Sequence, residues 1–362
     1  MGKLSLTRSI SCLALLFLSY IVMAQGVTTP RTPSPAATVS QTIGISTVAV
    51  NYSRPSVRGR QIWGGLVPYG WNRQGFGNGN EAPWRAGANE NTVITFSHPA
   101  TVEGQQVPAG SYGLFFVVNK DNTGELILSK DSRSWGSFWY NAAQDQLRAK
   151  IQLRAIPQTE LLTYEFSNLT KNSAELDLNW EKLQIPVKIE FAVDDIVMAN
   201  AADELKGATG FTWLGYAGAA NYSLQNKVNY DQGLKWIDQA IAINRNFNTL
   251  NVKSGILKQM GQDAESEKVM KEAIDLSTEN ELNLYGYQLM NAGQHDKAIE
   301  IFILNTQRHP NSPNAWDSLG EGYATKGDKK NAIANFKKCL SMNPPANVRA
   351  NSEKFLKQLG AL

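Results

Sequence analysis

The hydrophobic pattern changes its period once along the chain, near Asp195. Before this point apolar residues alternate with polar ones, most regularly at positions 162–166, 174–180 and 187–193. Turn sequences rich in Gly, Pro, Asn and Asp separate further apolar segments at 93–96, 112–118 and 125–129. A period of two with frequent turns predicts short antiparallel strands. We therefore expect an antiparallel β-sandwich or jelly-roll-like domain over residues 38–195.

After Asp195 the apolar spacing is that of helices, and it repeats at about 34 residues. The last unit follows W-x2-L-G-x2-Y, A-x3-F and P with Trp316, Leu319, Gly320, Tyr323, Ala332, Phe336 and Pro344. The unit before it follows the same spacing with Leu282, Tyr285, Gly286, Leu289, Ala298, Phe302 and Pro310. Both resemble the tetratricopeptide (TPR) repeat. Two looser units precede them, and the number of repeats beyond the two clear ones stays open.

The two halves together predict an α+β multidomain chain. We expect a linker at 196–208, followed by an all-α TPR-like solenoid at 209–362. Apolar residues of the stretch 348–359 lie on one helical face, so this stretch should form a capping helix.

The N-terminus has the pattern of a secretory signal. Lys3 and Arg8 precede an apolar run at 12–23, and Ala24 follows it. The run is shorter than the ~20 residues that cross a bilayer. We expect a signal peptide at 1–24, a flexible Pro/Thr/Ser-rich tether at 25–37, and no transmembrane segment after cleavage. The protein should then be periplasmic or extracellular, and its single remaining cysteine, Cys339, leaves no internal disulfide.

Composition and motifs narrow the chemistry. The whole chain carries 35 basic and 32 acidic residues, and two of the basic ones leave with the signal. No run of five like charges appears, so nucleic acid is not an expected partner. His98, His295 and His309 lack ligand-type partners at helical spacing, and no G-x-S-x-G occurs. We expect no metal and no cofactor. The sequence favours a non-enzymatic role and identifies no catalytic residue.

Several motifs of the first half resemble one family. They are NYSRPSVRGRQIWGGLVPYG at 51–70, PWRAGANENT at 83–92, VPAGSYGL at 107–114, and residues 176–186. In this order they resemble domain-of-unknown-function family 2911. The resemblance implies an exported bacterial protein with a compact β domain, and it implies no established activity. The chain departs from the family pattern between Gly70 and Trp84, where a Gly- and Asn-rich segment is inserted.

The same motifs hold the candidate ligand-binding residues. Guanidinium forks beside aromatic rings suit carboxylates, phosphates or sugars. The set is Arg54, Arg58, Arg60, Trp63, Tyr69, Trp84, Arg85, Asn89 and Glu90. The alternative is that the arginines bind backbone carbonyls and carboxylates to hold the loops, while the aromatic rings are core.

In the helical half, stacked repeats form a groove for peptides or partner helices. Polar residues expected in this groove are Asn221, Gln225, Asn251, Lys258, Asn283, Gln288, Asn291 and Asp317. The leading hypothesis is a protein-protein interaction scaffold. One alternative is a carbohydrate- or anionic-ligand-binding module or hydrolase, and another is a purely structural β domain.

Overall fold

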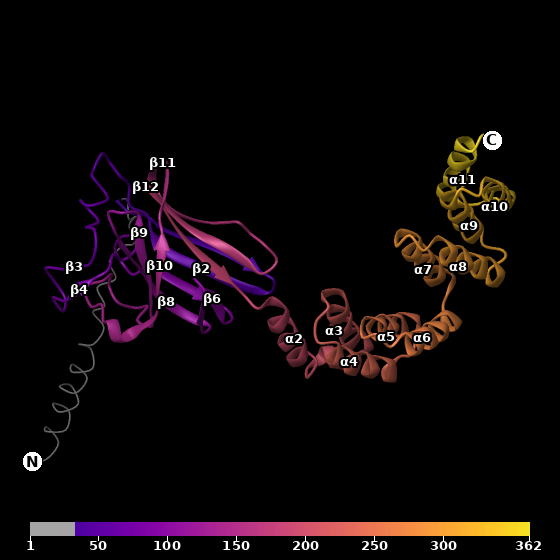
Figure 1. The fold of residues 1–362 in the computed structure, drawn as a ribbon, viewed down its shortest axis with the longest axis horizontal. Coiled ribbons are helices and arrows are strands. Elements are labelled where there is room, and N and C mark those ends of the chain that lie inside the picture. The colour runs from indigo at the N-terminus through magenta and orange to yellow at the C-terminus, as the bar shows by residue number, and fades with distance from the viewer. Residues whose placement is uncertain (1–32) are drawn as a thin grey trace, which may run out of the picture. The chain divides into compact units, whose positions relative to one another are not determined.

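The protein has two compact units that divide between Ile196 and Val197 (Figure 1). The structure is a computed structural model and describes residues 33–362. The predicted signal peptide and residues 25–32 of the predicted tether lie outside the described residues. The rest of the tether overlaps the first strand, because the chain already pairs with its neighbour at Ala36.

The first unit contains two larger antiparallel sheets. The six-stranded sheet has the order β1-β2-β5-β8-β9-β10 and the four-stranded sheet the order β11-β12-β6-β7. A two-stranded ribbon, β3-β4, lies in the segment inserted after Gly70. The strands are β1 (Ala36–Ile43), β2 (Ser46–Ser53), β3 (Asn72–Arg73), β4 (Glu81–Ala82), β5 (Val93–Phe96), β6 (Ala100–Val102), β7 (Gln105–Val107), β8 (Gly110–Val118), β9 (Thr123–Ser129), β10 (Asp145–Gln152), β11 (Arg154–Ser167) and β12 (Ser173–Glu190).

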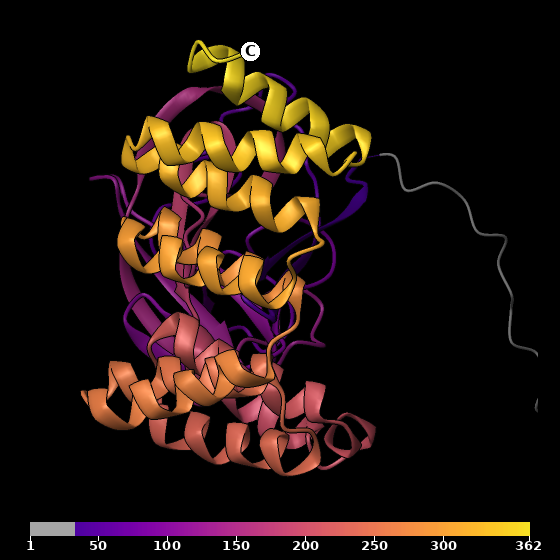
Figure 2. The ribbon, with the colours of Figure 1, turned by 90° about the vertical axis from the view of Figure 1, so that its right-hand side faces the viewer.

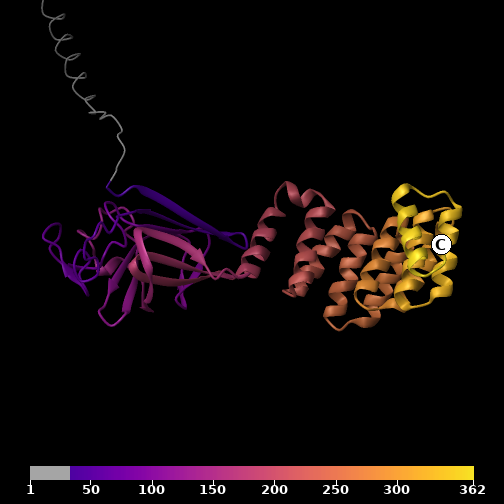
Figure 3. The same cartoon turned by 90° about the horizontal axis from the view of Figure 1, so that it is seen from above.

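The core of the first unit lies between the two larger sheets, and Figure 3 shows their long strands. Alternating residues of β2 are buried, as the period of two requires, whereas β12 also has a continuous buried stretch at 176–180. Tyr52 of β2 meets Tyr164 of β11 edge to face, with ring centroids 4.7 Å apart. The Tyr164 hydroxyl donates to the Ala86 carbonyl at 2.9 Å, and burial raises its pKa. The predicted antiparallel β domain is confirmed.

The second unit is helical. Its helices are α2 (Val193–Glu204), α3 (Trp213–Asn226), α4 (Tyr230–Ile243), α5 (Phe247–Gln259), α6 (Asp263–Leu276), α7 (Glu279–Asn291), α8 (His295–Arg308), α9 (Pro313–Lys326), α10 (Lys329–Ser341) and α11 (Ala346–Gln358). Helices α3 to α10 form successive antiparallel pairs, which stack one on the next in Figure 2. The predicted TPR-like arrangement is confirmed, with four helix pairs and the capping helix α11.

Local sequence explains where these helices begin and end. Ser312 caps α9 by accepting from the Ala315 amide, and Pro313 follows at the first helical position. Gly327 ends α9 in the left-handed conformation, with φ of 87°. Thr278 and Glu281 form a capping box at the start of α7.

The repeat glycines allow large rings to lie against the first helix of each clear repeat. A Cβ at Gly286 would lie 2.4 Å from Cε1 of Phe302, and one at Gly320 would lie 2.7 Å from Cε1 of Phe336. Both rings are fully buried. The G and F positions of the motif therefore form one contact between the paired helices. Cys339 is buried beside this contact on α10.

The segment 196–208, expected as a linker, is largely helical. It contains most of α2 and reaches the start of a short 3-10 helix, η3 (Ala208–Phe211). Its alanines favour helix, and Met198 is buried in the apolar cluster of α3 and α4. Within residues 33–362 no helix combines the length and apolarity that a membrane crossing needs.

Candidate functional site

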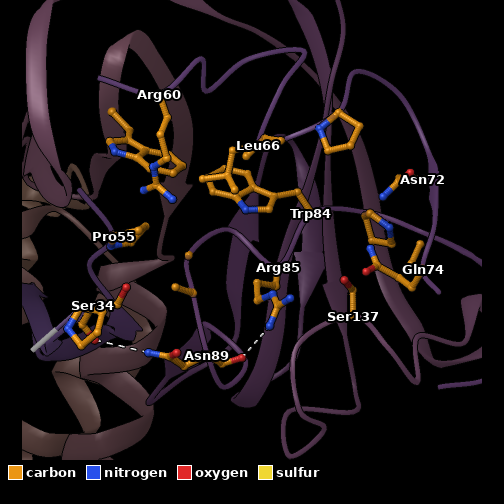
Figure 4. Close-up of a pocket in the computed structure, with 18 of the residues that line it drawn as sticks. Ser34, Pro55, Arg60, Leu66, Asn72, Gln74, Trp84, Arg85, Asn89 and Ser137 are labelled. Carbon is orange, nitrogen blue, oxygen red and sulfur yellow. Dashed lines mark hydrogen bonds between the residues drawn. The ribbon is translucent and has the colours of Figure 1, made fainter. Parts of the chain in front are cut away.

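A cavity of about 570 Å³ opens in the β domain (Figure 4). Its walls come from the β2–β3 connection, the β3–β4 ribbon, the β4–β5 and β9–β10 connections, the start of the described chain and β12. The lining includes Arg58, Arg60, Trp84, Arg85 and Asn89. The structure thus brings five of the predicted ligand-binding residues to one cavity.

The wall loops are tied to both sheets by backbone hydrogen bonds. Trp84 and Phe116 of β8 exchange two N–H to carbonyl bonds of 2.8 and 2.9 Å. On the other side, the Val57 amide donates to the Glu160 carbonyl at 2.8 Å. These bonds fix the approach of each loop, so the cavity is formed without a ligand.

The cavity wall contains strained backbone. Arg58, Ala86 and Asn89 have φ of 49°, 55° and 62°. Left-handed conformations cost non-glycine residues about 1 kcal/mol or more, and they cluster at functional sites. Hydroxyl groups of Thr92 and Tyr164 both donate to the Ala86 carbonyl and hold this turn in place.

Three tryptophans form one packed group at the cavity. The rings of Trp84 and Trp180 stack at 5.9 Å with an interplanar angle of 16°. Trp63 meets both edge on, at 5.5 and 5.9 Å. Trp84 and Trp180 line the cavity, whereas Trp63 packs against them outside the lining. The indole N–H groups of Trp63 and Trp180 are buried and have no partner in the described chain.

The lining is positively charged and contains no carboxylate. Its charged residues are Arg58, Arg60 and Arg85. None of the ion pairs within residues 33–362 involves these three guanidinium groups. A carboxylate or phosphate in the cavity would therefore meet cations that form no ion pair within residues 33–362.

Two of these arginines, Arg60 and Arg85, donate hydrogen bonds to backbone carbonyls. Arg60 donates through Nε to the Val57 carbonyl at 3.0 Å and through Nη2 to the Ser56 carbonyl. Arg85 donates through Nη1 to the Asn89 carbonyl at 2.8 Å, a bond drawn in Figure 4. Burial lowers the pKa of Arg85 because it penalises the charged form. An anion beside Arg85 would offset this penalty.

The other predicted ligand-binding residues lie elsewhere. Arg54 donates to the Leu162 carbonyl at 3.0 Å and to Thr163 Oγ1 at 2.6 Å, so it joins the end of β2 to β11. The Tyr69 ring is exposed and packs over Gly64. Glu90 is half-buried and, like Arg54 and Tyr69, is not part of the lining.

The cavity also has lining residues that the sequence did not indicate. They are mostly small or polar residues, such as Ser34 before β1, Asn72 of β3, and Gln74 and Ser137 of connecting loops, together with Trp180 of β12. Asn72 and Gln74 belong to the inserted segment, and its departure from the family pattern was the sequence feature that could have indicated them. Ser137 lies in a loop more than 50 residues after Trp84, and no feature of the sequence indicated it.

In the helical unit, the predicted groove residues lie on the first helix of each pair. Exposed members are Asn221 and Gln225 of α3, Lys258 of α5, and Gln288 and Asn291 of α7. Asn251 and Asn283 are half-buried on α5 and α7. None of these side chains forms a hydrogen bond or ion pair that the structure records among residues 33–362.

Asp317 is an exception to the predicted groove. It is only 5% exposed and accepts hydrogen bonds from Ser352 and from Asn351 Nδ2, the latter at 2.7 Å. Both donors belong to the capping helix α11, which covers this position in the last repeat. Burial raises the pKa of Asp317, and also that of Glu321, to which Asn351 donates as well.

Fold and cavity define a two-part protein, a β domain with a cationic cavity joined to a TPR-type helical array. Residues 34–189 match the family described as "Protein of unknown function (DUF2911)", and residues 313–345 match a tetratricopeptide repeat family. The β domain is therefore a DUF2911 domain, and the helical unit carries tetratricopeptide repeats, as the motifs predicted.

Other similarities each cover less than half of this chain. Superkiller complex protein 3 of Mus musculus is 28% identical over 74 residues, and that of Homo sapiens is 34% identical over 59 residues. These matches cover 20% and 16% of this chain but only 5% and 4% of those proteins. A solved structure of YrrB, described as a TPR protein with an unusual peptide-binding site, is 19% identical, with a TM-score of 0.28, over 44% of this chain and 84% of that one. A structure of MamA is 17% identical, with a TM-score of 0.28, over 42% and 89%.

Proposed function

We propose that this protein is an exported scaffold whose tetratricopeptide array binds a protein or peptide partner. The observation that carries the proposal is the row of polar side chains on α3, α5 and α7 that have no partner within the described chain. Amide groups of Asn and Gln both donate and accept, so they can bond a peptide backbone in either direction. The N-terminal signal pattern supports a periplasmic or extracellular site of action.

Affinity capture with matched charge variants tests the scaffold. Gln225→Arg with Gln288→Arg places two bulky cations on the first helices. Gln239→Arg with Gln307→Arg makes the same change at exposed positions on the second helices α4 and α8. We expect a protein from native envelope extract, identified by mass spectrometry, to be retained by the wild type and the second-helix variant and lost from the first-helix variant. Equal retention by both variants, or no retained protein, would contradict the groove as the binding surface.

The β-domain cavity supports a second function, the binding of a small anionic ligand. The specific observation is a lining with three arginines and no carboxylate among its described residues. This lining also lacks His and Cys, so it offers no general acid for glycoside hydrolysis. The geometry therefore favours a binding module over the hydrolase.

Calorimetry with galacturonate, which carries one carboxylate on a sugar ring, tests this second function. Arg85→Gln should weaken binding about ten-fold or more, because hydrogen bonds to charged groups contribute about 1.5–3 kcal/mol. Arg73→Gln is the matched control, since Arg73 lies in the same domain, is 80% exposed and is outside the lining. No binding by the wild type, or equal losses in the two variants, would refute an anion site in the cavity.

A further inference from the structure

Exposed aromatic rings adjoin the cavity. Phe76, Trp135 and Trp139 are 68%, 52% and 52% exposed, and we call these three residues the aromatic rim. The Phe76 ring centroid lies 6.3 Å from that of Trp139 and 5.5 Å from that of Phe138. Neighbouring exposed rings, such as those of Phe76 and Trp139, are typical of binding surfaces.

The rim is continuous with the cavity along both of its loops. Asn72 and Gln74 line the cavity and lie four and two positions before Phe76 in the inserted segment. Ser137 also lines the cavity and lies between the two rim tryptophans in sequence. A ligand longer than the cavity would therefore pass from the arginines onto the rim.

The rim loops are fixed in place before any ligand binds. The Asn78 amide donates to the Phe138 carbonyl at 3.0 Å, and Asn78 Nδ2 donates to the Tyr140 carbonyl at 2.9 Å. Gly77 makes this contact possible, since a Cβ there would lie 2.0 Å from the Phe138 carbonyl oxygen. The guanidinium carbon of Arg85 lies 5.1 Å from the Phe138 ring centroid and connects this loop to the cationic wall. Such preorganisation lowers the entropy cost of binding.

The chemistry of the combined surface identifies the class of ligand. The arginines of the lining form no ion pair within residues 33–362, so they favour an anionic ligand. Side chains of Asn72 and Gln74 form no hydrogen bond that the structure records within residues 33–362, and amides can both donate to and accept from sugar hydroxyls. Exposed flat rings suit the apolar faces of pyranose rings. We propose that the cavity and the aromatic rim together bind an acidic oligosaccharide, with one uronate in the cavity and the following sugars on the rim.

This inference rests on the anion-binding role of the cavity, and one calorimetric series separates the two. The mature full chain is titrated with galacturonate, with its tetramer and with neutral maltotetraose. The rim variant is Phe76→Ala with Trp139→Ala. Phe211→Ala is the matched control, because Phe211 is 84% exposed and lies in the helical unit. Thermal unfolding of each variant checks that the fold is retained.

We expect the tetramer to bind the wild type about ten-fold or more tightly than the monomer, and the neutral sugar to bind less well than either. The rim variant should lose this gain and keep its affinity for the monomer, while Phe211→Ala keeps both. Monomer binding with no gain for the tetramer would overturn the rim inference and leave the anion cavity standing. Absence of monomer binding would overturn the cavity as well.

Two further results would reject the saccharide as the occupant of the rim. One is equal binding of maltotetraose and the acidic tetramer. The other is loss of binding to phosphatidylglycerol vesicles or to a captured protein in the rim variant, with saccharide affinity unchanged.

Discussion

Adding one methyl group at Gly286 should destabilise the helical unit, because this residue touches the buried ring of Phe302. The new Cβ would lie 2.4 Å from Cε1 of the ring, where ordinary contacts begin near 3.4 Å. The ring is 0% exposed, and its opposite edge already lies close to α9, where a Cβ at Gly322 would be 3.0 Å from Cδ2. Overpacking of this kind costs about 1–3 kcal/mol. Alanine recovers about 0.5–1 kcal/mol of helix propensity, so with an overpacking cost of about 2 kcal/mol, the middle of its range, the expected net loss is about 1–1.5 kcal/mol.

The same substitution at Gly218 should have the opposite effect on the stability of the helical unit. Gly218 lies in α3, is exposed, and has no atom within 4 Å of a built Cβ. Gly218→Ala therefore gains helix propensity without a clash and should stabilise by about 0.5–1 kcal/mol. The two variants differ in the neighbour of the added methyl, which isolates the packing effect.

Urea unfolding, followed by far-ultraviolet circular dichroism, measures the stability of both variants. With slopes of about 1–3 kcal/mol per molar urea, Gly286→Ala should lower the helical midpoint by roughly 0.5–1 M. The slopes must agree among variants, because a repeat array can lose its cooperativity. An unchanged or raised midpoint for Gly286→Ala would refute the glycine–ring contact as the reason for a glycine at this position.

Three further predictions concern polar side chains that are buried or half-buried. Glu321→Gln should raise the helical midpoint near neutral pH, because burial and the neighbouring Asp317 raise the pKa of Glu321. A carboxyl group whose pKa is raised on folding adds stability below its pKa in the unfolded chain, and this stability is lost as the pH rises. The advantage of the variant over the wild type should therefore shrink in acid. Cys339 should react with a thiol reagent only after unfolding, since it is buried and desolvation raises its pKa; rapid native-state labelling would contradict this burial. Arg54→Met should lower the melting temperature of the β domain through loss of its bonds to β11 and leave galacturonate affinity unchanged; weakened binding without loss of stability would place Arg54 in the ligand site.

The sequence predicted the regular parts of the fold because they depend on local periodicity. Residues 93–96 were expected as a strand and form β5 with the same bounds. In contrast, the alternating segments 174–180 and 187–193 belong largely to one long strand, β12. The register shifts beside Glu181, whose φ is 54°, and this irregularity allows the strand to continue. Alternation gives the exposed face of a strand but not such an irregularity within it.

Residue types predicted part of the cavity, but only the three-dimensional arrangement separates its members. Arg54 and Arg60 both lie in the same short motif, yet Arg54 binds β11 and Arg60 lines the cavity. Which of them reaches the opening depends on where β11, more than 100 residues later, passes the loop. Likewise, the repeat pattern places Asp317 among the groove positions, and nothing in that pattern reveals that α11 covers it.

The strained cavity wall favours a binding role for the β domain over a purely structural one. Ala86 adopts a left-handed conformation that glycine would adopt at lower cost, and this costs alanine about 1 kcal/mol or more. Two buried hydroxyl groups are used to hold the Ala86 carbonyl. This turn places Arg85 at a preformed cavity. Arg85 is a half-buried cation and has no carboxylate partner in the described chain. In a domain serving only as a stable support, apolar packing could replace the contacts of Arg85 with the Asn89 carbonyl and the Phe138 ring, whereas a domain that binds an anion needs a cation at this place.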